Sequence, residues 1–175
     1  MNGCMHFHLW LKPAGNLYDR LAEVMKDLRH RYQGPAFDPH VTLLGELEGE
    51  EDELCEKVTA LARSLPELDI RLNAPAYQDD YFHCLYFTVE ATPEMMAAHQ
   101  QAQRTVARLP RSPFHPHVSL LYGVFPPEVK KCIIESLPRD LPLLGVVGEL
   151  VLVRAKSADP QDWHPVLECR LGEKG

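Results

Sequence analysis

The sequence lacks the features that would place the protein in a membrane, in a secretory route or along a nucleic-acid polymer. No apolar run approaches the roughly 20 residues that a transmembrane helix requires. The first ten residues, MNGCMHFHLW, lack the basic region and long apolar stretch of a signal peptide. Basic residues are in the minority, with 18 Lys and Arg against 25 Asp and Glu and a formal net charge of −7. Because neutralised phosphates supply most of the affinity for long nucleic acids, this balance favours a small phosphorylated ligand.

Cysteines are few and form no recognisable framework. There are five, an odd number, widely spaced and without a C-x-x-C pair. This usage favours reduced thiols over a disulfide scaffold or a zinc site, although one bridge stays open. We therefore expect a cytoplasmic protein without membrane association. The length of 175 residues suits one domain, and we expect a monomer.

Two segments of the chain repeat one another. Residues 37–44 read FDPHVTLL and residues 114–121 read FHPHVSLL. Seven of the eight positions are identical or exchange Thr for Ser, at an offset of 77. Upstream, Phe7-His8 matches Phe82-His83 at an offset of 75. The shared order of these matches indicates an internal duplication.

The hydrophobic spacing predicts the same element order in both halves, β-α-β-α-β. Each half begins with a β-prone segment, and the helix opening at Thr92-Pro93-Glu94 has proline at the first helical position, where it is tolerated. Two such units related by a pseudo-twofold axis predict an α+β fold of two lobes, with antiparallel or mixed sheets flanked by helices around a central cleft. We expect residues 1–175 to form this one domain, with the lobe boundary near 73–80. The expected strands are 5–12, 40–44, 70–72, 81–89, 117–121, 146–154 and 165–171, and the expected helices are 16–32, 50–65, 92–108 and 128–137.

Each repeated segment presents an imidazole and a hydroxyl on one face. Side chains two apart on a strand point the same way, so His40 lies beside Thr42 and His117 beside Ser119. Opening a cyclic phosphate requires one base for the attacking water and one acid for the departing ribose oxygen. Histidine serves either role near neutral pH, and hydroxyls can donate hydrogen bonds to the non-bridging oxygens. This scheme requires no metal and no cofactor.

The paired motifs carry a family resemblance. The contexts PHVTLL and PHVSLLYG, the central FHCLYF segment and the D-W-x-x-V stretch at 162–166 resemble those of the 2H phosphoesterase family. Within that family the chain is most similar to the small cyclic nucleotide phosphodiesterases of plants and yeast. The resemblance spans nearly the whole chain. It implies metal-independent hydrolysis of the 2′,3′-cyclic phosphate of a small nucleotide, or of ADP-ribose 1″,2″-cyclic phosphate, to a phosphomonoester.

The resemblance also implies roles for individual residues. His40 and His117 would form the acid–base pair, and Thr42 and Ser119 would bind the phosphate. Three aromatic residues, Trp10, Phe82 and Tyr122, would border the base or ribose. Strict alternation turns Tyr122 away from His117, so its role requires the strand to end or bulge there.

Other interpretations stay open at this point. An RNA substrate is one, because the resemblance extends to enzymes acting on RNA 3′ ends or 2′–5′ linkages, and with it a place in RNA processing. A nucleotide-binding module without turnover is another, although binding alone needs neither an acid nor a base. The pairs His6/His8 and His115/His117 have the spacing of metal ligands but lack a regularly spaced third ligand. His8 and its repeat equivalent His83 are interpreted as packing or rim residues.

Overall fold

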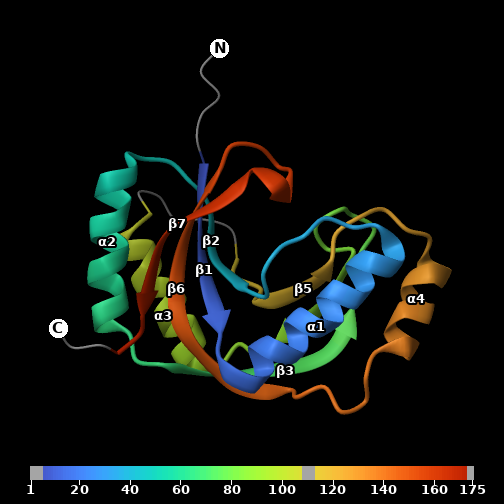
Figure 1. Ribbon diagram of the computed structural model, residues 1–175. Helices are drawn as coiled ribbons and strands as arrows, with labels where there is room; N and C mark the ends of the chain where they lie inside the picture. The colour runs from blue at the N-terminus through green and yellow to red at the C-terminus, as the bar shows by residue number, and fades with distance from the viewer. Residues whose placement is uncertain (1–5, 108–112, 173–175) are drawn as a thin grey trace.

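A computed structural model describes residues 6–107 and 113–172 (Figure 1). Within these ranges the element order is the expected one, including the last expected strand, 165–171, which the structure gives as β7. The elements are β1 His6–Pro13, α1 Gly15–Tyr32, β2 Val41–Leu47, α2 Glu51–Ser64, β3 Leu68–Ala76, β4 Leu85–Val89, α3 Pro93–Thr105, β5 His117–Leu121, α4 Pro127–Ser136, β6 Leu144–Ala155, a 3₁₀ turn Pro160–Asp162, and β7 Trp163–Arg170.

The strand pairings of the described residues are all antiparallel, which confirms the expected α+β class. The strands follow the order β1-β2-β5-β4-β3-β6-β7, and β1 also pairs with β6. Along one edge of β6, residues 144–147 pair with β3 and residues 149–155 pair with β7. β6 therefore joins two sheet regions, one centred on β1 and one on β4. At the other junction, β2 and β5 meet through the pair Val41 and Val118.

The helices pack across the two halves of the sequence. α1, from the first half, contacts β5, whereas α3, from the second half, contacts β2 and lies beside α2. Figure 1 shows α2 and α3 together on one side and α1 with α4 on the other. One bond fixes α3 behind β2: the buried His99 donates from Nδ1 to the Leu43 carbonyl at 2.9 Å. The back of each repeated segment is thus covered by a helix from the other half.

The helical spacing seen in the sequence corresponds to the buried faces. Leu17, Leu21, Val24, Met25 and Leu28 of α1 are all buried. α3 begins as its sequence indicates, because the Thr92 side chain accepts from the Met95 amide at 3.2 Å and Pro93 is at the first turn. The helix ends at Thr105, and Arg108, its expected end, lies outside the described residues.

The expected strand 81–89 is wrong in its first four residues. β4 begins only at Leu85, because the Asp80 carboxylate closes a turn. Its Oδ1 accepts from the backbone amides of Phe82 and His83, each at 2.9 Å. A short acidic side chain that accepts from the amides two and three residues later competes with strand pairing. The connection 77–84 therefore leaves the sheet and turns toward the cleft described below.

β3 is longer than expected, since it continues from Leu68 through Ala76. The predicted lobe boundary near 73–80 overlaps its end and the start of the connection, and stays a prediction. In the part of the chain that the structure describes, no helix is long and apolar enough to cross a bilayer.

Candidate active site

The seven residues singled out from the sequence line one cleft of about 420 Å³. This volume lies within the range of small-molecule sites. β5 contributes an imidazole and a hydroxyl, β2 contributes the second hydroxyl, and His40 lies directly before β2, which begins one residue later than the expected strand 40–44. β1 contributes an indole, and the connection before β4 contributes a phenyl ring. The seven are Trp10, His40, Thr42, Phe82, His117, Ser119 and Tyr122.

The junction of β2 and β5 brings the two repeated segments together. Val41 and Val118 are paired across the antiparallel strands, and both are fully buried. In an antiparallel register the residues flanking this pair lie crosswise, so His40 is opposite Ser119 and Thr42 is opposite His117. Each imidazole therefore lies across from a hydroxyl of the other repeat.

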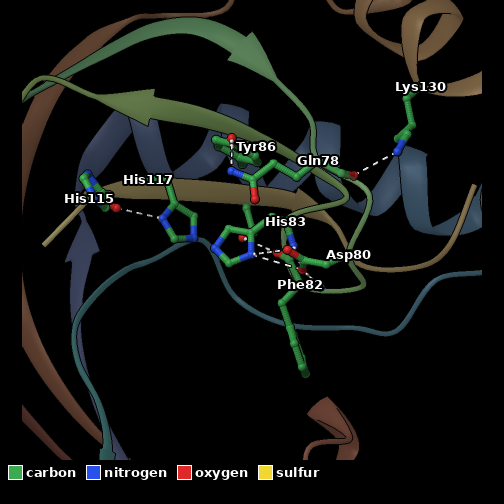
Figure 2. Close-up of polar contacts among 9 residues, drawn as sticks. Gln78, Asp80, Phe82, His83, Tyr86, His115, His117 and Lys130 are labelled. Carbon is green, nitrogen blue, oxygen red and sulfur yellow. Dashed lines mark hydrogen bonds and ion pairs between the residues drawn. The ribbon is translucent and has the colours of Figure 1, made fainter. Parts of the chain in front are cut away.

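Both imidazoles are oriented by the same backbone contact. His40 Nδ1 lies 2.6 Å from the Asp38 carbonyl oxygen, and His117 Nδ1 lies 3.0 Å from that of His115. A carbonyl oxygen only accepts, so each Nδ1 carries the proton and donates it. In each ring, Nε2 is left as the nitrogen that can exchange a proton with a ligand. Figure 2 shows His117 held in this way, with its second nitrogen on the side of His83.

His40 is in the more enclosed environment of the two. Its ring stacks on Trp10, with centroids 3.7 Å apart and planes inclined by 11°. Only 5% of the residue is exposed. Burial lowers the pKa of His40 to about 3, against the raising effect of the Asp38 carbonyl, and nearby His117 and His8 lower it further. The neutral imidazole is therefore the resting form at neutral pH.

His117 is more accessible and has polar neighbours. The rings of His83 and Tyr86 lie 5.0 and 5.4 Å from its own, measured between centroids. Burial lowers the pKa of His117, while the His115 carbonyl and the Asp80 carboxylate act in the opposite direction. The two motif histidines thus have similar hydrogen bonds but different surroundings.

Tyr122 reaches the cleft because β5 ends at Leu121. The end of the strand removes the strict alternation that would have turned the ring away. Its ring stacks on Phe37 with centroids 3.9 Å apart, and burial raises the pKa of its hydroxyl. Phe82 lies edge-on to Tyr122 at 5.3 Å, and its carbonyl is 3.4 Å from Ser119 Oγ. These rings form an apolar wall next to the hydroxyl groups.

Some residues of the cleft were not assigned to it from the sequence. Trp163 is one, with its ring 5.9 Å from Trp10 and 6.2 Å from Phe82, and the D-W-x-x-V stretch that contains it was the available signal. His83 is another, and its equivalence to His8 in the repeat was the signal. Further lining residues are His6, His8, Gly45, Glu46, Ala155, Ser157 and Ala158.

Metal-ligating side chains do not gather into a site in the described ranges. Over residues 6–107 and 113–172, no group of three or more His, Cys, Asp or Glu side chains could hold a metal ion. The described cysteines, Cys55, Cys84, Cys132 and Cys169, are all free thiols.

Comparison with known protein sequences matches this chain to cyclic phosphodiesterases. The family model described as cyclic phosphodiesterase-like protein matches residues 5–169. A cyclic phosphodiesterase of Arabidopsis thaliana is 26% identical over 171 residues, which cover 94% of each chain. A 2′,3′-cyclic-nucleotide 3′-phosphodiesterase of Yarrowia lipolytica is 29% identical over 97 residues, covering 51% of this chain and 45% of the yeast protein.

Solved structures share the fold at lower identity. Escherichia coli LigT complexed with 3′-AMP superposes with a TM-score of 0.60 at 15% identity, covering 97% of this chain and 99% of LigT. A Thermus thermophilus protein also superposes with a TM-score of 0.60, at 18% identity, covering 97% of this chain and 100% of the other. These solved structures therefore share the fold of this chain.

Proposed function

The chain belongs to the cyclic phosphodiesterase-like family of phosphoric diester hydrolases, and on that premise we propose that it hydrolyses 2′,3′-cyclic phosphates of small nucleotides without a metal. His40 and His117 are the acid–base pair of this proposal, and the product is a phosphomonoester. The observation that carries it is the crosswise placement of two imidazoles and two hydroxyls in one cleft, each imidazole with its Nδ1 proton bound to a backbone carbonyl.

The reaction is balanced by two proton transfers. One Nε2 accepts a proton from water as its oxygen attacks phosphorus, and the other Nε2 donates a proton to the ribose oxygen as the P–O bond breaks. Thr42 and Ser119 donate hydrogen bonds to the non-bridging oxygens, where negative charge is concentrated in the transition state. The Nδ1 bonds orient both rings and leave Nε2 of each as the nitrogen that accepts or donates the proton.

The proposed ligand is a single nucleotide. Trp10, Phe82 and Tyr122 would contact its base or ribose, because aromatic faces stack on nucleobases. LigT has been crystallised with 3′-AMP, with ATP and with NADP⁺, and the Yarrowia relative is named for 2′,3′-cyclic nucleotides. ADP-ribose 1″,2″-cyclic phosphate presents the same cyclic diester and is included in the proposal.

RNA 3′ ends are a weaker proposal. Long nucleic acid requires basic residues along its path, and none of the described residues lining the cleft is Lys or Arg. Glu46, an acidic residue, is among the lining residues instead. We propose a cytoplasmic monomer, which cell fractionation and light scattering would test.

The deciding experiment is ³¹P NMR of the protein incubated with each nucleoside 2′,3′-cyclic monophosphate and EDTA. A single monoester product supports the proposal, excludes dependence on a chelatable metal and identifies the leaving oxygen. Turnover that EDTA abolishes contradicts the metal-independent mechanism. If none of these nucleotides is turned over, the substrate to test next is ADP-ribose cyclic phosphate or an RNA end. If those also fail, the protein is better described as a nucleotide-binding module.

Variants test the two histidines separately. His40→Ala and His117→Ala should each lower the rate at least about 100-fold, the usual contribution of a general acid or base. His164, exposed on β7 and outside the cleft lining, gives a matched control, since His164→Ala should retain normal turnover. Near-normal turnover by either motif variant would refute its assignment.

A further inference from the structure

The duplication places a second imidazole near each motif histidine. His8 and His83 are equivalent in the repeat, and both line the cleft. Their hydrogen bonds differ, however. His8 Nδ1 accepts from the Glu46 amide at 3.4 Å, whereas His83 Nδ1 lies 2.9 Å from Asp80 Oδ2 and 3.1 Å from Oδ1. The duplicated imidazole of the second half therefore has a carboxylate partner at the edge of the cleft.

The contact with Asp80 orients the His83 ring. A carboxylate accepts, so Nδ1 carries a proton and Nε2 is the nitrogen that faces away from Asp80. Figure 2 shows this second nitrogen pointing toward His117, and the two ring centroids are 5.0 Å apart. The same carboxylate closes the turn through the Phe82 and His83 amides. One side chain therefore fixes both the backbone and the imidazole.

The connection 77–84, which contains Asp80 and His83, is also fixed by hydrogen bonds to α4 and β4. Lys130 of α4 is 2% exposed and donates to the Gln78 carbonyl at 2.8 Å and to Asp79 Oδ1 at 2.6 Å. The Gln78 amide donates to the Tyr86 hydroxyl at 3.1 Å (Figure 2). Three further hydrogen bonds, two from α4 and one to β4, thus hold the connection in place. His83 is not a side chain of a loose loop.

We propose that His83, paired with Asp80, is a third phosphate-binding group of the cleft, which holds the substrate's cyclic phosphate and, more strongly, the monoester product. This inference rests on the proposed function and names a further binding group for the phosphate at that same site. His83 would donate from Nε2 to a non-bridging oxygen, on the His117 side of phosphorus.

The need for such a group follows from charge. A phosphate ligand is an anion, and the described cleft lining provides no Lys or Arg to balance it. His40 and His117 exchange protons during the reaction, so neither is a constant cation. Because Nδ1 already donates to Asp80, donation from Nε2 to an anion uses the doubly protonated ring, in which both nitrogens are donors. The product monoester carries more negative charge than the cyclic diester, so it gains more from this contact.

The test compares His83→Gln with wild type. Glutamine retains a side-chain donor but no charge. The affinity for inorganic phosphate, measured by calorimetry, should fall at least about tenfold, the effect of losing one charge-assisted hydrogen bond. With a 2′,3′-cyclic nucleotide, KM should rise at least about tenfold while kcat changes less than about threefold. Asp80→Asn, which keeps the acceptor for the turn amides, should weaken phosphate binding in the same direction.

Each outcome decides the proposal. In the His83→Gln background, adding Asp80→Asn should change phosphate affinity by less than about twofold, because the carboxylate acts through the imidazole. His164→Gln serves as the control and should bind phosphate like wild type. Unchanged phosphate affinity in His83→Gln would overturn the proposal, as would a loss confined to kcat, which indicates an effect through His117. If His83→Gln does not fold, the phosphate affinity of Asp80→Asn tests the proposal instead. Failure of wild type to turn over any substrate would refute the proposed function, and phosphate affinity would still decide the role of His83.

Discussion

The indole of Trp10 lies flat against the imidazole of His40, with centroids 3.7 Å apart. The ring shields His40 from water, and burial is the main reason that the pKa of His40 is about 3. Trp10→Ala should therefore raise this pKa toward the ordinary value of about 6.5, because water would stabilise the imidazolium. An NMR titration of the His40 ring measures it.

Trp163→Ala is the matched control for this change. It removes an indole from the same cleft, but one that is edge-on to Trp10 at 5.9 Å instead of stacked on His40. Its effect on the pKa of His40 should be clearly smaller. Equal shifts in the two variants would show that general opening of the cleft, not the stacked ring, sets the protonation of His40.

The pH dependence of turnover should follow from the two lowered pKa values. In the free enzyme, kcat/KM requires one neutral and one protonated histidine, and these pKa values belong to the pair. Burial lowers the pKa of both His40 and His117 below about 6.5, so the protonated acid is lost as pH rises through that region. We expect a bell with its optimum on the acid side of about pH 6.5.

Steady-state rates at constant ionic strength between about pH 4 and 9 give this profile. The kcat optimum should lie at a higher pH than that of kcat/KM, because a bound anion stabilises imidazolium. A flat kcat/KM between about pH 5 and 8 would exclude the paired-histidine mechanism.

The free energy of unfolding should depend on pH through His40. Below about pH 6.5 the unfolded chain binds a proton at His40, whereas the folded protein does so only near pH 3. The free energy of unfolding should therefore decrease as pH falls from about 6.5 toward 3, by about 1.4 kcal/mol per pH unit from this group. His40→Gln should make the slope shallower by about that amount. Urea unfolding at several pH values measures both slopes, and His164→Gln should retain that of wild type.

The sequence predicts the part of the site that depends on repetition. His40 and Thr42, like His117 and Ser119, share a face because strand alternation requires it, and duplication brings the pairs together. His83 could not be placed in the same way. Its segment has strong β propensity, but the Asp80 carboxylate captures two amides and ends the strand pairing before Leu85. A local hydrogen bond thus overrides a propensity that is correct for the rest of β4.

The sequence also could not predict that α1 and α3 each pack on a strand from the other half of the chain. Apolar spacing identifies the buried face of α1 or α3, but not the strand on which it packs. Here α1 contacts β5 and α3 contacts β2, so each repeated segment is supported by the other half. The polar contact of His99 with the Leu43 carbonyl gives no periodic signal, because it joins residues 56 apart in the chain.

Lys130 connects the stability of the fold to the shape of the cleft. Its ammonium group is buried and bonded to the Gln78 carbonyl and to Asp79, in the connection that carries Asp80 and His83. Lys130→Met retains the apolar stem but leaves the carbonyl without this donor, so the free energy of unfolding should fall by about 1–3 kcal/mol. KM for a cyclic nucleotide should also rise, because the turn loses its anchor to α4.

The exposed neighbour provides the control: Lys131→Met should change neither value. Urea unfolding and steady-state kinetics on both variants separate the effects, and a Lys130→Met protein with lowered stability but wild-type KM would show that Asp80 and the Gln78–Tyr86 bond hold the turn without the lysine.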